Sequence, residues 1–131
     1  DVYKRQLLNF GHTFGHALET YFSYSEKLLH GEAVSLGIVL AARFSNQEGY
    51  LSERKLENIH NHLHSMKLPT VITQIHNAKL DITKLLTFMK QDKKVVGDNI
   101  NLILLKDIGK GFIERNVSFQ KLEKFLQVQL S

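Results

Sequence analysis

The sequence predicts a mainly α-helical domain with one small β-hairpin near residues 99–115. Apolar residues recur at spacings of three and four along most of the chain, which is the period of a helical face. This pattern changes over 99–109 to a segment rich in Ile and Leu, which is typical of a strand. The 131 residues suffice for one core, and no repeat or low-complexity linker divides them, so we expect a single domain over 1–131.

Helices are expected in six segments, namely 7–23, 31–48, 52–67, 70–77, 82–90 and 118–130. The first half of segment 31–48 is apolar almost all round, which predicts a buried central helix. Gly49 fits the C-terminal end of that helix, and Ser52 and Asp81 fit the N-caps of later ones. Residues 111–116 are expected to return along the predicted strand through a turn at 107–110.

Composition excludes several classes of function. The sequence has no apolar run of about 18 residues, the length that a membrane span requires, and its first residues lack the apolar core of a secretory signal. The chain has no cysteine, so a metal site must use His, Asp or Glu. The net charge is +4, but the basic residues are dispersed, which argues against nucleic acid. We therefore expect a cytoplasmic protein without a membrane or nucleic-acid partner, and a fragment of a longer one because it begins at Asp1 rather than Met.

The stretch "LNFGHTFGHALE" places His12 and His16 four residues apart, so on a helix both rings leave one face. His30 follows 14 residues after His16, in "LLHGEAV", which is enough chain to return to the first pair. Imidazole is a common metal ligand near neutral pH. Such a pair alone is more often a packed or solvated feature, but three histidines flanked by glycines favour a metal or ligand site. The glycines also indicate that something approaches the backbone closely there.

Two further groups are weaker candidates. The cluster "HNHLH" at residues 60–64 is interpreted as part of a surface helix, because residues two apart point in different directions and only His60 and His64 could share a face; His76 is interpreted as structural. Lysines in "MKQDKK" commonly only complement a helix end. Alternatively, Lys93 or Lys94 binds a phosphate or carboxylate as a point charge.

In combination, "LLNFGHTFGHALE", "LLHGEAVSLG" and "FMKQDKKVVGDNINLILLKDIG" resemble 3-dehydroquinate synthase, from about Arg5 to the end of the chain. What matches is the C-terminal helical domain of that family; the N-terminal Rossmann-like domain that binds NAD is absent from this chain. The resemblance implies conversion of 3-deoxy-D-arabino-heptulosonate 7-phosphate to 3-dehydroquinate and phosphate, in the shikimate pathway. It implies NAD and Zn²⁺ or Co²⁺ as cofactors, a phosphorylated sugar acid as substrate, and a homodimer at full length.

Residue roles follow from the same resemblance. His12 and His30 correspond to two metal ligands, and the third, a glutamate, lies in a segment that this sequence does not contain. His16 corresponds to a catalytic residue that contacts the substrate and transfers a proton. Glu32 is assigned only to orienting a ligand ring. The remaining substrate contacts implied are Arg5, Asn9 and either Lys93 or Lys94.

Three alternatives stay open. Another sugar-phosphate cyclase is hard to separate, because its discriminating residues need not lie in this segment. Metal-dependent glycerol-type dehydrogenases share the two-domain plan but have a different histidine pattern. A non-catalytic helical binding module predicts nucleic-acid affinity that falls steeply with salt, without zinc dependence.

Overall fold

The computed structural model describes residues 12–22, 30–68, 81–91, 95–97, 99–107 and 110–130. The mainly helical prediction is confirmed in this part of the chain. Its elements are α2 (His12–Tyr21), α3 (His30–Gln47), α4 (Glu53–Ser65), α6 (Ile82–Lys90), β1 (Val95–Val96), β2 (Asn99–Asp107), β3 (Lys110–Ser118) and α7 (Phe119–Leu130). The predicted helix at 70–77 and residues 7–11 of the first predicted helix lie outside the described residues.

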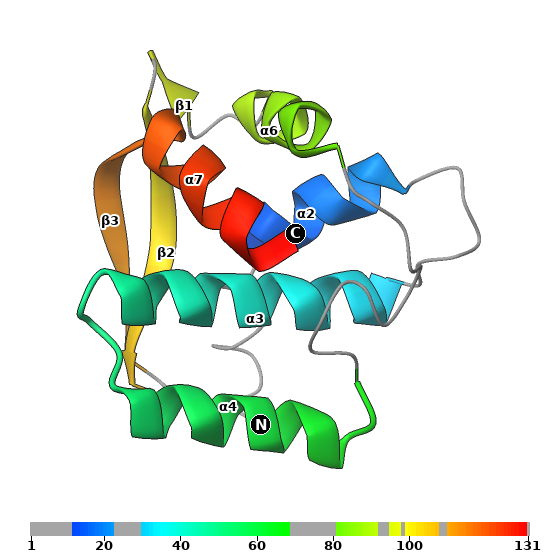
Figure 1. Ribbon diagram of the computed structural model, residues 1–131, viewed down its shortest axis with the longest axis vertical. Coiled ribbons are helices and arrows are strands. Elements are labelled where there is room, and N and C mark those ends of the chain that lie inside the picture. The colour runs from blue at the N-terminus through cyan, green and yellow to red at the C-terminus, as the bar shows by residue number, and fades with distance from the viewer. Residues whose placement is uncertain are drawn as a thin grey trace.

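Helix α3 lies across the middle of the domain (Figure 1). Helix α4 runs beside it on one side, α2, α6 and α7 lie on the other, and the sheet stands near the end where α3 finishes. The contacts agree with this view, because α3 touches α2, α4 and β2, while α2 also touches α6. Among the described helices, none combines the length and apolar character needed to cross a membrane.

The central position of α3 follows from its composition, as predicted. Residues 35–42 of α3 are buried all round the helix, because Ala and aliphatic residues leave almost no polar face there to turn toward water. Near its C-terminal end, Phe44 is fully buried and its ring meets Phe125 of α7 nearly edge-on, with centroids 5.1 Å apart. Phe14 of α2 reaches the same Phe125 ring at 6.3 Å. One aromatic side chain of α7 therefore joins both α2 and α3.

Capping residues lie at the helix termini where the sequence predicted them. Ser52 accepts a hydrogen bond from the Lys55 amide at 3.2 Å, and Asp81 accepts one from the Lys84 amide at 3.2 Å. Gly49 has φ of 85°, the left-handed conformation that suits glycine after a helix. These caps satisfy backbone groups that have no partner within the helix.

The spacing of Ile59, Leu63 and Met66 predicts that all three lie in a buried stripe along α4, and for Met66 this prediction is wrong. Ile59 and Leu63 are buried, but Met66 is 44% exposed. The helix ends at Ser65, and Lys67 takes φ of 58°, so the backbone leaves the helical path before Met66 can continue the apolar face. Periodicity predicted the stripe correctly only as far as the helix continued.

The hairpin is longer than predicted and carries an extra strand. Strands β2 and β3 pair antiparallel from Asp107↔Lys110 to Asn99↔Ser118, so β3 extends past residue 115. The two-residue strand β1 pairs antiparallel with the start of β2 and gives the order β1-β2-β3. The sequence pattern did not predict this strand. Two residues are too short to show the alternation by which a strand is predicted.

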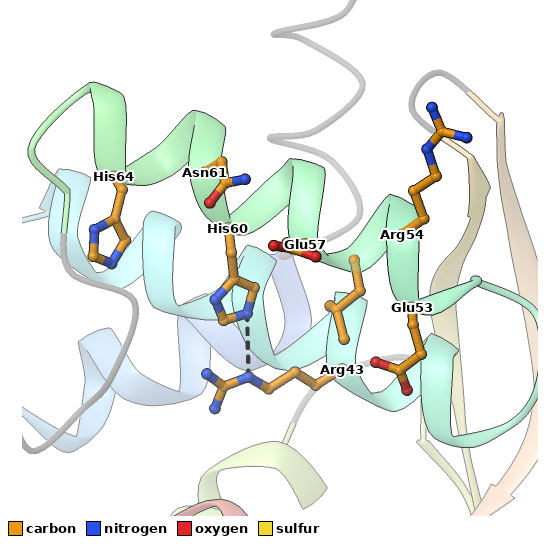
Figure 2. Close-up of a pocket in the computed structure, with 8 residues that line it drawn as sticks. Arg43, Glu53, Arg54, Glu57, His60, Asn61 and His64 are labelled. Atoms are coloured by element: carbon orange, nitrogen blue, oxygen red, sulfur yellow. Dashed lines mark hydrogen bonds between the residues drawn. The ribbon is translucent and has the colours of Figure 1, made fainter.

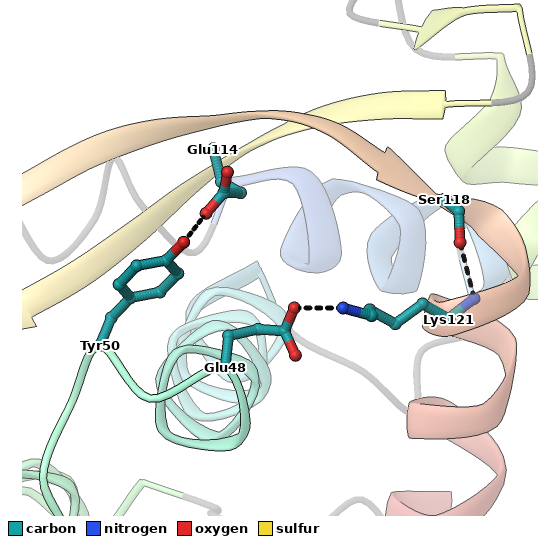
Figure 3. Close-up of polar contacts among 5 residues, drawn as sticks. All are labelled: Glu48, Tyr50, Glu114, Ser118 and Lys121. Atoms are coloured by element: carbon teal, nitrogen blue, oxygen red, sulfur yellow. Dashed lines mark hydrogen bonds and ion pairs between the residues drawn. The ribbon is translucent and has the colours of Figure 1, made fainter.

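Side-chain contacts hold the hairpin and α7 to the loop after α3 (Figure 3). The Tyr50 hydroxyl bonds the Glu114 carboxylate on β3, and this hydrogen bond raises the pKa of Tyr50. Lys121 of α7 pairs with Glu48 at 2.6 Å, and the Lys121 amide donates to the Ser118 hydroxyl just before α7. Surface contacts of this kind contribute little to stability individually, so they fix the position of the hairpin and α7 more than they stabilise the fold.

Ser45 is a buried polar link between α3 and the sheet. Its hydroxyl donates to the Ala41 carbonyl at 2.7 Å and accepts from the Leu105 amide of β2 at 3.0 Å. The side chain has no exposed surface, so water cannot replace it. A buried amide without a partner is costly, and this one hydroxyl prevents that cost.

We predict that Ser45→Ala lowers the free energy of unfolding by about 1–3 kcal/mol, because it leaves the buried Leu105 amide without its acceptor. Urea denaturation followed by circular dichroism measures the change. Ser65→Ala is the matched control, because the Ser65 hydroxyl is exposed and bonds only within its own turn to His62. Equal losses in the two variants would contradict the role assigned to Ser45.

Candidate functional site

The predicted site depends on how α2 meets α3, and Gly15 lies at a close contact between the two helices. A Cβ placed on Gly15 would lie 3.1 Å from the Ala33 carbonyl oxygen and 3.6 Å from the Val34 Cα. Both neighbours are backbone atoms of α3. The prediction that something approaches this glycine is therefore confirmed, and the neighbour is another helix.

This contact limits the separation of His12 and His30. Each of these histidines lies three residues before a partner in the contact, His12 before Gly15 and His30 before Ala33. Three residues of α-helix separate Cα atoms by about 5 Å, so the Cα atoms of His12 and His30 are no more than about 17 Å apart. The two helices run in opposite directions (Figure 1), so the contact sets only this upper limit, and the two side chains lie outside the described residues. A shared metal ion stays a prediction.

His16 lies one turn after His12 on α2, and its side chain is exposed. The residues on either side of it, Gly15 and Ala17, are buried, so α2 turns its apolar face inward and presents His16 outward. Glu32 is half-buried in the first turn of α3. Both positions agree with side chains that are accessible to a ligand.

The other predicted substrate contacts, Arg5, Asn9, Lys93 and Lys94, lie outside the described residues. Within the part of the chain that the structure does describe, no group of three His, Cys, Asp or Glu side chains is arranged to hold a metal. The ligand set implied by the resemblance includes only His12 and His30 from this chain. The assignments of Arg5, Asn9, Lys93 and Lys94 to substrate binding therefore stay predictions.

A separate groove of about 750 Å³ lies between α4 and the second half of α3 (Figure 2). The side chains that line it are mostly charged or polar, namely Arg43, Glu53, Arg54, Leu56, Glu57, His60, Asn61 and His64. Arg43 comes from α3 and the others from α4, whereas the histidine motif occupies α2 and the start of α3. The groove thus differs from the predicted site.

Arg43 links three helices beside this groove. Its Nε donates to His60 Nε2 of α4 at 3.3 Å, and its Nη1 donates to Gln129 Oε1 of α7 at 2.9 Å. Because His60 Nε2 accepts, the ring is neutral there and carries its proton on Nδ1. The link is therefore built from one cation and two neutral acceptors.

Burial changes the proton affinity of both partners in this link. Desolvation lowers the pKa of Arg43, although a guanidinium stays charged near neutral pH. Burial also lowers the pKa of His60, and the charges of Arg43 and His64 lower it further. The surface-helix interpretation of "HNHLH" is correct for His62 and His64, which are exposed, and wrong for half-buried His60. A single arginine within a helix predicted to be buried was the sequence signal for this link.

Comparison with known proteins identifies the family. Residues 1–95 match the model of the family described as "3-dehydroquinate synthase C-terminal". The chain belongs to this family.

Relatives extend the match along the chain. A 3-dehydroquinate synthase of Bartonella quintana (strain Toulouse) is 40% identical over 129 residues, which cover 98% of this chain and 34% of the relative. One from Vesicomyosocius okutanii subsp. Calyptogena okutanii (strain HA) is 44% identical over 121 residues, covering 92% of this chain and 32% of the relative. The chain therefore spans about a third of the length of the relatives it matches.

Solved structures share the fold. A 2-deoxy-scyllo-inosose synthase complexed with carbaglucose-6-phosphate, NAD⁺ and Co²⁺ aligns with a TM-score of 0.73 at 24% identity, over 92% of this chain and 34% of the other. The 2-epi-5-epi-valiolone synthase ValA of Streptomyces hygroscopicus subsp. jinggangensis 5008, with NAD⁺ and Zn²⁺ bound, aligns with a TM-score of 0.72 at 22% identity, over 95% and 33%. The predicted fold class, a helical domain of the dehydroquinate synthase-like type, is thereby confirmed.

We predict that acid weakens the fold through His60. Its pKa in the folded protein is below the ordinary value of 6.5, so the unfolded chain takes up this proton first as the pH falls. The contribution is complete above pH 6.5 and is lost as the pH decreases toward the lowered pKa. Unfolding free energies measured by urea denaturation between pH 7.5 and 5, a range of about one unit or more on each side of the ordinary pKa, follow this loss.

His60→Gln is the decisive variant, because glutamine can still accept from Arg43 but does not titrate. Its unfolding free energy should depend less on pH than that of the wild type. His62→Gln, a change at an exposed position on the same helix, should leave the wild-type dependence intact. An unchanged pH dependence in His60→Gln would contradict the assignment.

Proposed function

We propose that this chain is the metal- and substrate-binding domain of a 3-dehydroquinate synthase. The observation that supports this activity most directly is the 40% identity to a relative of that name over 98% of the chain, together with the histidine motif that this chain carries on α2 and α3. Because the chain spans 34% of that relative, we further propose that the NAD-binding domain and the third metal ligand, a glutamate, belong to a segment outside this sequence. The proposed location is the cytoplasm and the proposed full-length state is a homodimer.

Within this chain, His12 and His30 are the proposed metal ligands. Their donor chemistry fits, because neutral imidazole nitrogen binds Zn²⁺ and Co²⁺ well. The contact between α2 and α3 at Gly15 is compatible with this role, since it limits the separation of the two histidine Cα atoms to about 17 Å. When bound, the metal would hold substrate hydroxyls and polarise the carbon that is oxidised, while NAD would accept and return the hydride.

The remaining residues would act on the substrate directly. His16 would transfer a proton near the phosphate, a role for which an exposed imidazole next to a ligand position is suited. Arg5 would hold a phosphate or carboxylate through its two-pronged guanidinium, and Asn9 would hydrogen-bond the substrate. Lys93 or Lys94 would add a point charge. Net release of phosphate makes the overall reaction a lyase reaction.

A second candidate is another sugar-phosphate cyclase. The two solved structures that share this fold act as 2-deoxy-scyllo-inosose synthase and 2-epi-5-epi-valiolone synthase, as their names state. Their identity to this chain, 24% and 22%, is well below the 40% of the dehydroquinate synthase relative. Offering the full-length protein 3-deoxy-D-arabino-heptulosonate 7-phosphate, glucose 6-phosphate and other sugar phosphates in turn separates the two candidates by which substrate releases its phosphate or closes its ring.

We predict that His12→Ala in the full-length protein lowers phosphate release from 3-deoxy-D-arabino-heptulosonate 7-phosphate by more than about 100-fold. Loss of a group that only supports a ligand already costs about 10–100-fold, and loss of the ligand should cost more. A chelator should inhibit the wild type, and added Zn²⁺ or Co²⁺ should restore it. The matched control is His62→Ala, an exposed histidine on α4 that the proposed site does not include. Wild-type rates in His12→Ala would refute the metal role.

We predict that His16→Ala retains metal binding but lowers kcat by about 10²–10⁴-fold, the usual contribution of a positioned acid or base. Metal content measured by atomic absorption separates this result from the loss expected in His12→Ala. The single variants Lys93→Ala and Lys94→Ala, compared by their KM values, decide which lysine meets the substrate. Loss of metal from His16→Ala would contradict the division of roles between the two histidines.

A further inference from the structure

We propose that Gly15 is a positioning residue, which sets the separation of α2 and α3 at the value that lets His12 and His30 share one metal ion. This inference rests on the proposed function, because it takes those two histidines as ligands. It adds a structural requirement to the motif, in which the glycine between the two histidines of α2 acts on metal geometry without touching the metal.

The first step is steric. A Cβ on Gly15 would meet the Ala33 carbonyl oxygen at 3.1 Å, which is closer than nine in ten real Cβ contacts. The obstructing atoms, this oxygen and the Val34 Cα at 3.6 Å, belong to the backbone of α3 and not to a side chain that can rotate away. Relief therefore requires the two helices to separate by a few tenths of an ångström.

The second step concerns how far such a separation displaces the two histidines. Gly15 and Ala33 lie one helical turn after His12 and His30 respectively, so a shift at the contact is carried almost rigidly to both ligand positions. Metal–ligand distances tolerate only about 0.2 Å, and a working constellation must be held to within about 0.5 Å. A displacement of a few tenths of an ångström is thus small for a helix packing but large for a shared ion.

The third step is that α2 has little freedom to compensate. Its other sides are occupied, because the Tyr21 ring meets Phe88 of α6 edge-on at 6.3 Å and the Tyr21 hydroxyl accepts a hydrogen bond from the Asp81 amide at 3.0 Å. Phe14 meets Phe125 of α7 at 6.3 Å. Moving α2 away from α3 compresses these contacts, so the displacement is distributed along α2 and reaches His12.

The experiment compares Co²⁺ binding by the full-length protein in its wild-type form and as Gly15→Ala. Co²⁺ affinity is measured by competition with a chromophoric chelator, and ligand geometry by the visible d–d absorption of the bound ion. We expect Gly15→Ala to bind Co²⁺ at least about 10-fold more weakly with a changed d–d spectrum, as for loss of a supporting group. Its metal-free circular dichroism and urea midpoint should stay close to wild type, because alanine is the better helix former.

Two controls separate spacing from general loosening. Ala17→Gly removes a buried methyl group from the same helix and adds no atom at the contact, so it should lower the urea midpoint more than it alters the Co²⁺ spectrum. Gly111→Ala adds a methyl group on β3, where the nearest atom is at an ordinary 3.7 Å, and should match the wild type in both measurements.

Three results would contradict the inference, and they differ in what they imply for the proposed function. Wild-type Co²⁺ affinity and spectrum in Gly15→Ala would overturn the inference while leaving the proposed function intact. Failure of Gly15→Ala to fold without metal would also overturn it, because the glycine would then serve helix packing in general. Absence of Co²⁺ binding by the wild type, or unchanged binding in His12→Ala, would overturn the proposed metal site and the inference together.

Discussion

The backbone contact between α2 and α3 at Gly15 is the constraint on which the proposed site depends. Helices with side chains at their crossing usually lie 8–10 Å apart, and a glycine permits a closer approach. The cost is a weaker helix, since glycine is a poor helix former. Here the buried apolar residues of α2, including Phe14 and Leu18, stabilise the helix through packing, so it forms in spite of the glycine.

Hydrogen bonds from two polar side chains of α3 hold other elements in position against this helix. Ser45 joins the end of α3 to β2, and Arg43 joins it to α4 and α7. These links are directional, whereas the apolar contacts around them are not, so the links select one arrangement among several that would bury similar area. A helix that is buried all round needs such links, because its own surface gives no preferred orientation.

The histidine motif and the groove beside Arg43 illustrate two uses of the same side chain. His12, His16 and His30 lie on or near the tight crossing of α2 and α3, in glycine-rich sequence. His60 lies where burial and a neighbouring cation keep it neutral, and it serves as an acceptor that joins helices. Spacing alone does not distinguish these uses, because both sets include a pair four residues apart. Their surroundings do.

Neighbouring residues in the sequence were enough to predict the described helices, two of their caps and the hairpin turn, because each depends on local contacts: Ser52 and Asp81 cap as expected, and Asp107 pairs with Lys110. It also determined the family, through motifs that are local in the chain. Four features could be seen only in the tertiary structure. They are the contact of Gly15 with α3, the burial of His60 against Arg43, the exposure of Met66 and the additional strand β1. The reason is that each of these depends on atoms brought together from distant parts of the chain or on the exact residue at which a helix ends, and periodicity along the sequence contains neither.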